Sequence, residues 1–134
     1  MIGRRIFLKM LAVAPFAALA DKAVEARSEK RTVDLAEFPV AGFQYHDGMK
    51  SHVMASLAVG TELRLVREPG NRYDDKAIAL HSATGAMIGY IPRDLNSIPA
   101  AMLDQNVRLQ TSISSVTPDA ATWERVRVVV RQVV

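Results

Sequence analysis

After Phe38 the chain alternates between apolar and polar residues over several short intervals, which is the pattern of half-buried β-strands. Between residues 61 and 67, Leu63 and Leu65 fall on one face of a strand, and the charged residues beside them fall on the other. Strands of this kind are predicted at residues 38–45, 61–67, 77–81, 87–91, 107–113 and 126–130.

One interval has helical rather than strand periodicity. Apolar residues recur every three or four positions between Leu95 and Leu103, which predicts a helix there. Asn96 or Ser97 would cap the start of this helix, and Asn106 would end it.

Turn-forming residues separate the predicted strands. Asp47-Gly48 follows the first strand, and Pro69-Gly70 breaks the chain after the second. Residues 83–86 join the third and fourth strands as a hairpin, and residues 50–58 predict a short helix or a loop. Together these signals predict a mainly β fold: a small six-stranded OB-like antiparallel barrel with one or two short helices.

The N-terminal residues have the organisation of a secretory signal peptide. Residues 1–9 are positively charged, residues 10–20 are apolar, and Ala18-Leu19-Ala20 supplies the small-x-small pattern of a cleavage site. The apolar run is too short for a membrane span, which needs about 20 residues. Arg4-Arg5, followed by Ile-Phe-Leu-Lys, resembles the twin-arginine export signal.

This pattern predicts export, with the protein in the periplasm; if the signal is not used, the protein is cytoplasmic. An amphipathic N-terminal helix or an uncleaved membrane anchor is the alternative. We therefore expect a signal peptide at residues 1–26, a polar tether at residues 27–37 and a folded domain at residues 38–134.

The net charge of +3 does not describe the folded part of the chain. Of the 17 Lys and Arg residues, three lie within the first 20 residues, where there is no acidic side chain. The remaining 14 basic residues balance the 14 acidic ones. Any contact with nucleic acid must therefore depend on local placement of charge and not on a field over the whole domain.

Nothing in the sequence indicates catalysis or metal binding. The chain has no cysteine, and His46, His52 and His81 have neither the spacing of metal ligands nor a carboxylate cluster beside them. Asp74-Asp75 would point to opposite faces of a strand and suits a turn equally well. No nucleophile elbow or phosphate-binding loop occurs. We predict no catalytic residue, no metal, no cofactor and no enzymatic activity.

Three motifs in the middle of the chain are more specific. They are VAGFQYH at residues 40–46, REPGNRYDDKAIAL at residues 67–80 and GAMIGYIPR at residues 85–93. In this order they resemble the HIRAN domain, a module that also occurs alone in bacteria, and the likeness extends over residues 38–130. The resemblance implies an OB-like barrel that binds the 3′ end of single-stranded DNA.

The resemblance also implies roles for individual residues. Tyr45 and Tyr73 would be aromatic platforms for terminal bases, and Asp74 would accept a hydrogen bond from the free 3′-hydroxyl. Such a carboxylate would repel a 3′-phosphate, so one side chain could distinguish the two kinds of end. Stacking of a base on an aromatic ring stabilises binding by about 1–3 kcal/mol and tolerates any sequence.

Further contacts would fix the sugar-phosphate backbone. The resemblance places Asn71 beside the sugar and phosphate, and Tyr90 and Arg93 near the phosphates. The chain departs from the family pattern at Gln44, where DNA-binding members can have an arginine. Tyr90 and Pro92 also replace polar or basic groups found in some members.

Two functions stay open at this stage. The first is a module that binds nucleic-acid ends without turnover. The second is an exported protein-interaction or scaffold domain, with a periplasmic protein as partner, that has lost DNA binding. For the motif residues themselves the alternative is structural: Asn71 and Asp74 would hold a turn, and Tyr73 and Tyr90 would be half-buried barrel side chains. The sequence leaves the oligomeric state undetermined.

Overall fold

The computed structural model describes residues 31–134. The export signal predicted at residues 1–26 lies outside the described residues, so both the signal and the periplasmic location stay predictions. The strands are β1 (Thr32–Pro39), β2 (Glu62–Glu68), β3 (Ala77–His81), β4 (Met87–Tyr90), β5 (Leu109–Val116) and β6 (Val126–Val133). The helices are α2 (Ser51–Ser56), α3 (Ser97–Asp104) and the 3-10 turns η1 (Phe43–Tyr45), η2 (Asp47–Met49), η3 (Arg93–Leu95) and η4 (Thr122–Glu124).

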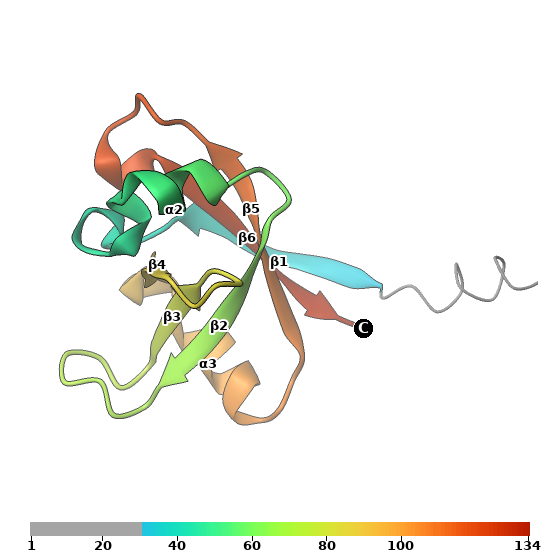
Figure 1. The fold of residues 1–134 in the computed structure, drawn as a ribbon. Helices are drawn as coiled ribbons and strands as arrows, with labels where there is room; N and C mark the ends of the chain where they lie inside the picture. Colours follow the sequence, from blue (N-terminus) through green and yellow to red (C-terminus); the bar gives the residue numbers. More distant parts are fainter. Residues whose placement is uncertain (1–30) are drawn as a thin grey trace, which may run out of the picture. The chain divides into compact units, whose positions relative to one another are not determined.

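The six strands form one antiparallel sheet in the order β1-β6-β5-β2-β3-β4. The start of β2, at Glu62 and Leu63, pairs with β5, whereas residues 64–68 pair with β3. Because β2 changes partner along its length, the sheet bends there, and β3 and β4 turn away from β5 and β6 (Figure 1). The prediction of a mainly β fold with six antiparallel strands is confirmed.

The two edges of this bent sheet meet at Ala41 and Tyr90, and the contact closes the barrel. The backbone N–H of each residue donates to the carbonyl of the other, and both N···O distances are 2.9 Å. Just before this bridge, the backbone N–H of Val40 donates to the Val126 carbonyl over 2.9 Å. The chain between β1 and η1 therefore bridges β6 and β4, which closes the barrel without a seventh strand.

Closure depends on a glycine in β4. Gly89 has φ +149°, a value that L-residues rarely adopt. A Cβ built on Gly89 would lie 2.4 Å from Val40 Cγ1 and 2.5 Å from the Ala41 carbonyl oxygen. The absence of a side chain thus lets the backbone of β4 approach the segment after β1.

The core is built from the inward-facing residues of the strands together with a few residues from helices and turns. Ala100 of α3, Val53 of α2 and Phe43 of η1 belong to the same cluster as the strand residues. In Figure 1, α2 and α3 lie at opposite ends of the barrel. The largest fully buried apolar side chains are Phe38, Phe43, Ile78, Leu80, Ile88, Ile91, Ile113, Val40, Val126, Val128 and Val130.

The first strand lies earlier in the sequence than predicted. β1 comprises Thr32–Pro39, so residues 32–37, which we expected to be part of a polar tether, are strand. Residues 43–45, expected to end the first strand, form η1 instead. Gly42, with φ +69°, precedes that turn and breaks the extended chain.

The early start of β1 has a cross-strand cause. Arg131 of β6 pairs with Asp34 (2.7 Å) and Arg127 of β6 pairs with Glu37 (3.3 Å). Surface pairs of this kind stabilise a sheet only slightly, but they remove the repulsion that unpaired acids would add to an edge strand. A segment of mixed charge thus forms a strand because its backbone pairs with β6, and the charges on the two strands are compatible with that pairing.

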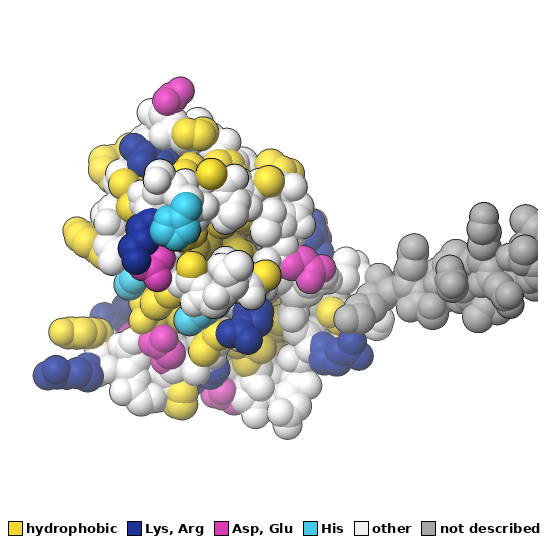
Figure 2. Space-filling view, in the orientation of Figure 1, with side chains coloured by type: hydrophobic (Ala, Val, Ile, Leu, Met, Phe, Trp, Pro, Cys, Tyr) yellow, Lys and Arg dark blue, Asp and Glu magenta, His cyan; other side chains and the backbone are white. Residues whose placement is uncertain are grey.

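Charged side chains of both signs are interspersed on the visible face of the domain (Figure 2). None of the helices in residues 31–134 has the length and apolar character that crossing a bilayer requires. Within the same residues there is no cluster of three or more metal-ligating side chains.

Candidate functional site

The loop between β2 and β3 is built around the side chain of Asn71. Its Oδ1 accepts hydrogen bonds from the backbone N–H groups of Tyr73 (2.9 Å) and Asp74 (3.1 Å), which is an Asx-type turn. Its Nδ2 donates to Glu68 Oε1 over 3.0 Å. The Asn71 side chain therefore holds the turn and links it to Glu68.

Glu68 joins this loop to β4. The same Oε1 that accepts from Asn71 also accepts a hydrogen bond from the Tyr90 hydroxyl over 2.9 Å. Burial, and then the hydrogen bond to the Glu68 carboxylate, raise the pKa of Tyr90 above its ordinary value. Tyr90 is therefore neutral at physiological pH, and its hydroxyl donates its hydrogen bond to Glu68.

Both carboxylate oxygens of Asp74 are held by protein groups. Oδ1 accepts from the backbone N–H of Lys76 (2.9 Å), and Oδ2 accepts from Asn96 Nδ2 (2.7 Å). These two hydrogen bonds lower the pKa of Asp74 below 3.8, and the nearby charge of Arg93 acts in the same direction. Asp74 is therefore ionised at neutral pH and can act only as an acceptor.

This lowered pKa also links Asp74 to stability. A carboxyl group whose pKa falls on folding stabilises the fold above its unfolded value of about 4. That contribution is lost as the pH falls through the still lower folded-state pKa of Asp74.

Asn96, by contrast, does not have the role that its position predicts. It stands at the N-cap of α3 but makes no side-chain capping hydrogen bond, and its backbone is helical. Its side chain is only 2% exposed and donates to Asp74, so it ties the start of α3 to the loop. The structure thus uses a cap-like residue to position a carboxylate.

Arg67 of β2 holds the outer part of the same loop. Its Nη1 donates to the Asp75 carbonyl over 2.7 Å, and its Nη2 donates to Asp104 Oδ2 of α3 over 3.1 Å. Because its guanidinium donates to both the loop and α3, Arg67 secures the loop. It is therefore not available to replace the phosphate contact that an arginine at the position of Gln44 would make.

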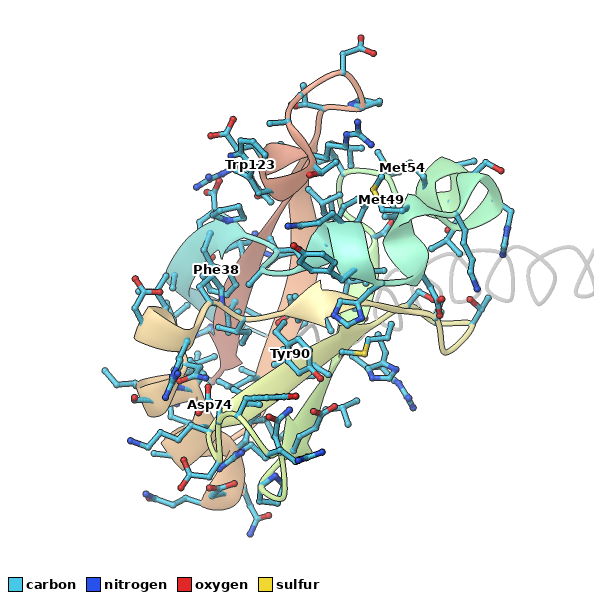
Figure 3. The ribbon with its side chains drawn as sticks, turned by 90° about the vertical axis from the view of Figure 1, so that its left-hand side faces the viewer. Phe38, Met49, Met54, Asp74, Tyr90 and Trp123 are labelled. Carbon is cyan, nitrogen blue, oxygen red and sulfur yellow. The ribbon has the colours of Figure 1, made fainter. Side chains whose placement is uncertain are left out.

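These residues border a pocket of about 420 Å³. In Figure 3 Asp74 and Tyr90 are labelled on the same side of the barrel, with Asp74 in the loop below β4. Arg93 of η3 also lines the pocket, and within residues 31–134 it forms no ion pair. The lining residues are Ala41, His46, Asn71, Tyr73, Asp74, Ala77, Tyr90, Ile91 and Arg93.

Five of the six site residues predicted from the sequence therefore meet at this pocket: Asn71, Tyr73, Asp74, Tyr90 and Arg93. The sixth, Tyr45, does not line it, although the next residue, His46, does. Tyr73 and Tyr45 are 82% and 81% exposed, so both present open ring faces, and the alternative of a half-buried barrel side chain is wrong for Tyr73. Tyr90 is half-buried, as that alternative predicts, and Asn71 and Asp74 do hold the turn.

Sequence reasoning missed three residues of the site. From the sequence alone, His46 is considered only as a metal ligand and Asn96 only as a helix cap, and Glu68 is given no role of its own. Glu68 lies inside the REPGN motif, so the motif itself was the signal that could have identified it. His46 and Asn96 join the site only through the fold, and no local signal marks them.

A small antiparallel barrel with a pocket of mainly apolar lining and a few polar groups, beside the loop between two of its strands, defines an OB-like binding module. The sequence profile described as "HIRAN domain" matches residues 33–132. The chain belongs to the HIRAN domain family.

Comparison with solved structures agrees with this assignment. A protein from Lactobacillus plantarum is similar with a TM-score of 0.67 and 28% identity, over 78% of this chain and 98% of that one. The HIRAN domain of human HLTF shares the fold with a TM-score of 0.56 and 17% identity, over 76% of this chain and 78% of that one.

One curated relative is a much longer protein. The Fanconi-associated nuclease 1 homolog of Arabidopsis thaliana is 28% identical over 83 residues, which is 61% of this chain. Those residues cover 9% of the relative, so the chain spans only a small part of its length.

Proposed function

We propose that this HIRAN domain is a nucleic-acid-binding module that holds the 3′ end of single-stranded DNA in the pocket beside Asp74, without turnover. One observation carries the proposal: an ionised carboxylate, fixed by two hydrogen bonds, borders the same pocket as an exposed tyrosine and an arginine that forms no ion pair within residues 31–134. Family membership supports a binding role.

Asp74 supplies the selectivity for the end. A carboxylate has about four acceptor positions, and the two hydrogen bonds within the protein leave room for a third from a ligand hydroxyl. A 3′-hydroxyl can donate to it, whereas a 3′-phosphate presents only negative charge and acceptor oxygens at neutral pH. The proposed site therefore distinguishes a free hydroxyl end from a phosphorylated end.

The remaining residues fit the rest of a terminal nucleotide. Tyr73 offers its open ring for stacking of a base, and Tyr45, outside the pocket, offers a second ring for a neighbouring base. Arg93 can neutralise a phosphate, and Asn71, which lines the same pocket, would lie beside the sugar and phosphate. Tyr90 contributes the wall of the pocket through its ring, since its hydroxyl already donates to Glu68.

The test is fluorescence anisotropy of the protein with a 5′-labelled oligothymidine that ends in either a 3′-hydroxyl or a 3′-phosphate. We expect the hydroxyl end to bind about tenfold more tightly or better, which corresponds to one charge-assisted hydrogen bond gained and one repulsion avoided. Absence of binding to both oligonucleotides at low salt would overturn the proposal. That outcome would favour the second hypothesis, an exported protein-interaction domain.

Replacement of Tyr73 by alanine should weaken binding of the hydroxyl-ended oligothymidine by about 5- to 100-fold, because one stacking platform is lost. Tyr73→Phe keeps the ring and should bind like the unchanged protein. The phenylalanine variant is the control, since the Tyr73 hydroxyl makes no hydrogen bond within residues 31–134. Equal affinities of the two variants would argue against stacking at this position.

A further inference from the structure

His46 lies in the wall of the proposed DNA-end pocket, directly after η1. Its ring meets the Tyr90 ring edge to face, with 5.6 Å between centroids and an interplanar angle of 67°. On another side it lies near Gly42, where a Cβ would be 3.6 Å from His46 Nε2. The imidazole is thus held between β4 and the turn before η1, at the edge of the space that the DNA end would occupy.

Neither ring nitrogen of His46 is engaged by the protein. Within residues 31–134, the ring of His46 takes part in no side-chain hydrogen bond and no ion pair, whereas His81 contacts the Gly85 carbonyl over 3.3 Å. A histidine at a pocket wall with both nitrogens free can donate a charge-assisted hydrogen bond to a bound anion once it is protonated.

The charges around His46 leave such a proton available to a ligand. Asp47, the nearest acid along the chain, is paired with Lys50 over 3.0 Å. Tyr90 is neutral, because burial and Glu68 raise its pKa. The titratable or charged groups on the elements around His46 are Tyr45, Asp47, Lys50, Asp74, Tyr90 and Arg93.

We propose that His46 is a second cationic contact for a phosphodiester of the bound strand, in addition to Arg93, and that it acts only when protonated. This inference rests on the function proposed above. Histidine is the side chain that most commonly changes charge between pH 5 and 8, so affinity for DNA should rise as the pH is lowered across that interval. Asp74 opposes this trend only below pH 3.8, because its pKa is lowered, and a phosphodiester keeps one charge over the whole interval.

The experiment is an anisotropy titration of the hydroxyl-ended oligothymidine at about pH 7.5 and about pH 5.5, over the normal range of histidine titration. The unchanged protein should bind about three- to tenfold more tightly at the lower pH, as expected for one charge-assisted contact. The slope of log K against log salt should become steeper by about 0.7, which is the value for one additional phosphate neutralised on a single strand.

Three variants identify the group responsible. His46→Gln should lose both the pH effect and the change in salt slope, since glutamine has no titrating proton. His52→Gln and His81→Gln alter histidines that do not line the pocket and should keep both effects. A pH effect that survives in His46→Gln, or a flat profile in the unchanged protein, would overturn the role of His46. Absence of DNA binding at both pH values would instead overturn the proposed function, and this inference with it.

Discussion

Replacing Asp74 with alanine should reduce affinity for a hydroxyl-ended oligothymidine about tenfold or more, while affinity for the 3′-phosphate form should rise or stay the same. The reason is that one group makes the two ends different: the carboxylate accepts from a hydroxyl and repels a phosphate. Its pKa is lowered by the hydrogen bonds from Lys76 and Asn96, so the charge is fully present at neutral pH. Anisotropy titrations with the two oligonucleotides, which differ only at the 3′ end, measure the ratio of the two affinities directly.

Asp74→Ala also removes the acceptor for two donors, so loosening of the loop must be separated from loss of the ligand contact. Asn96→Ala is the control, because it breaks the same 2.7 Å hydrogen bond from the other side and leaves the carboxylate in place. We expect Asn96→Ala to weaken binding of both oligonucleotides but to keep the preference for the hydroxyl end. If Asp74→Ala kept that preference, the assignment of Asp74 as the selective group would be wrong.

Replacing Gly89 with alanine should destabilise the domain by about 3–5 kcal/mol, the range of strong overpacking combined with backbone strain. The added Cβ would lie 2.5 Å from the Ala41 carbonyl oxygen, and a backbone atom cannot be moved aside by a change of rotamer. The same contact breaks the pair of hydrogen bonds between Ala41 and Tyr90 that closes the barrel. Urea unfolding followed by circular dichroism gives the loss in free energy.

Gly85→Ala is the matched control for this prediction. Gly85 also has a positive φ, of +89°, but no atom lies within 4 Å of a Cβ built there. Its replacement should cost only the backbone strain, about 1 kcal/mol. If the two variants lost equal stability, the close approach at Gly89 would not be what sustains the barrel closure.

The local alternation of apolar and polar residues is sufficient to predict most of the strands. The alternation that places Leu63 and Leu65 on one face of β2 appears as a buried Leu63 and a partly buried Leu65. The helix after Pro92 and the short helix near residue 51 also form where the sequence predicts them. These elements could be predicted because their burial follows from spacing along the chain, which the sequence contains completely.

The first strand shows where local pattern fails. Residues 32–37 carry mixed charge and predict a tether, but they form an edge strand because their backbone pairs with β6, where Arg127 and Arg131 form ion pairs with Glu37 and Asp34. The bridge between Ala41 and Tyr90 is another long-range pairing of this kind. Neither could be predicted, since a partner about 50 to 100 residues away leaves no mark on the local sequence.

The cysteine-free β domain and its REPGNRYD loop, with Asn71, Tyr73 and Asp74, can be predicted from the amino-acid sequence, because turn chemistry and motif order are local properties. Which side chains meet that loop can be seen only in the folded domain. In the folded domain Asn96 donates a hydrogen bond to Asp74, and His46 lines the pocket whereas Tyr45 does not. The physical reason is that a pocket is formed by elements distant in sequence, and their approach depends on core packing and barrel closure.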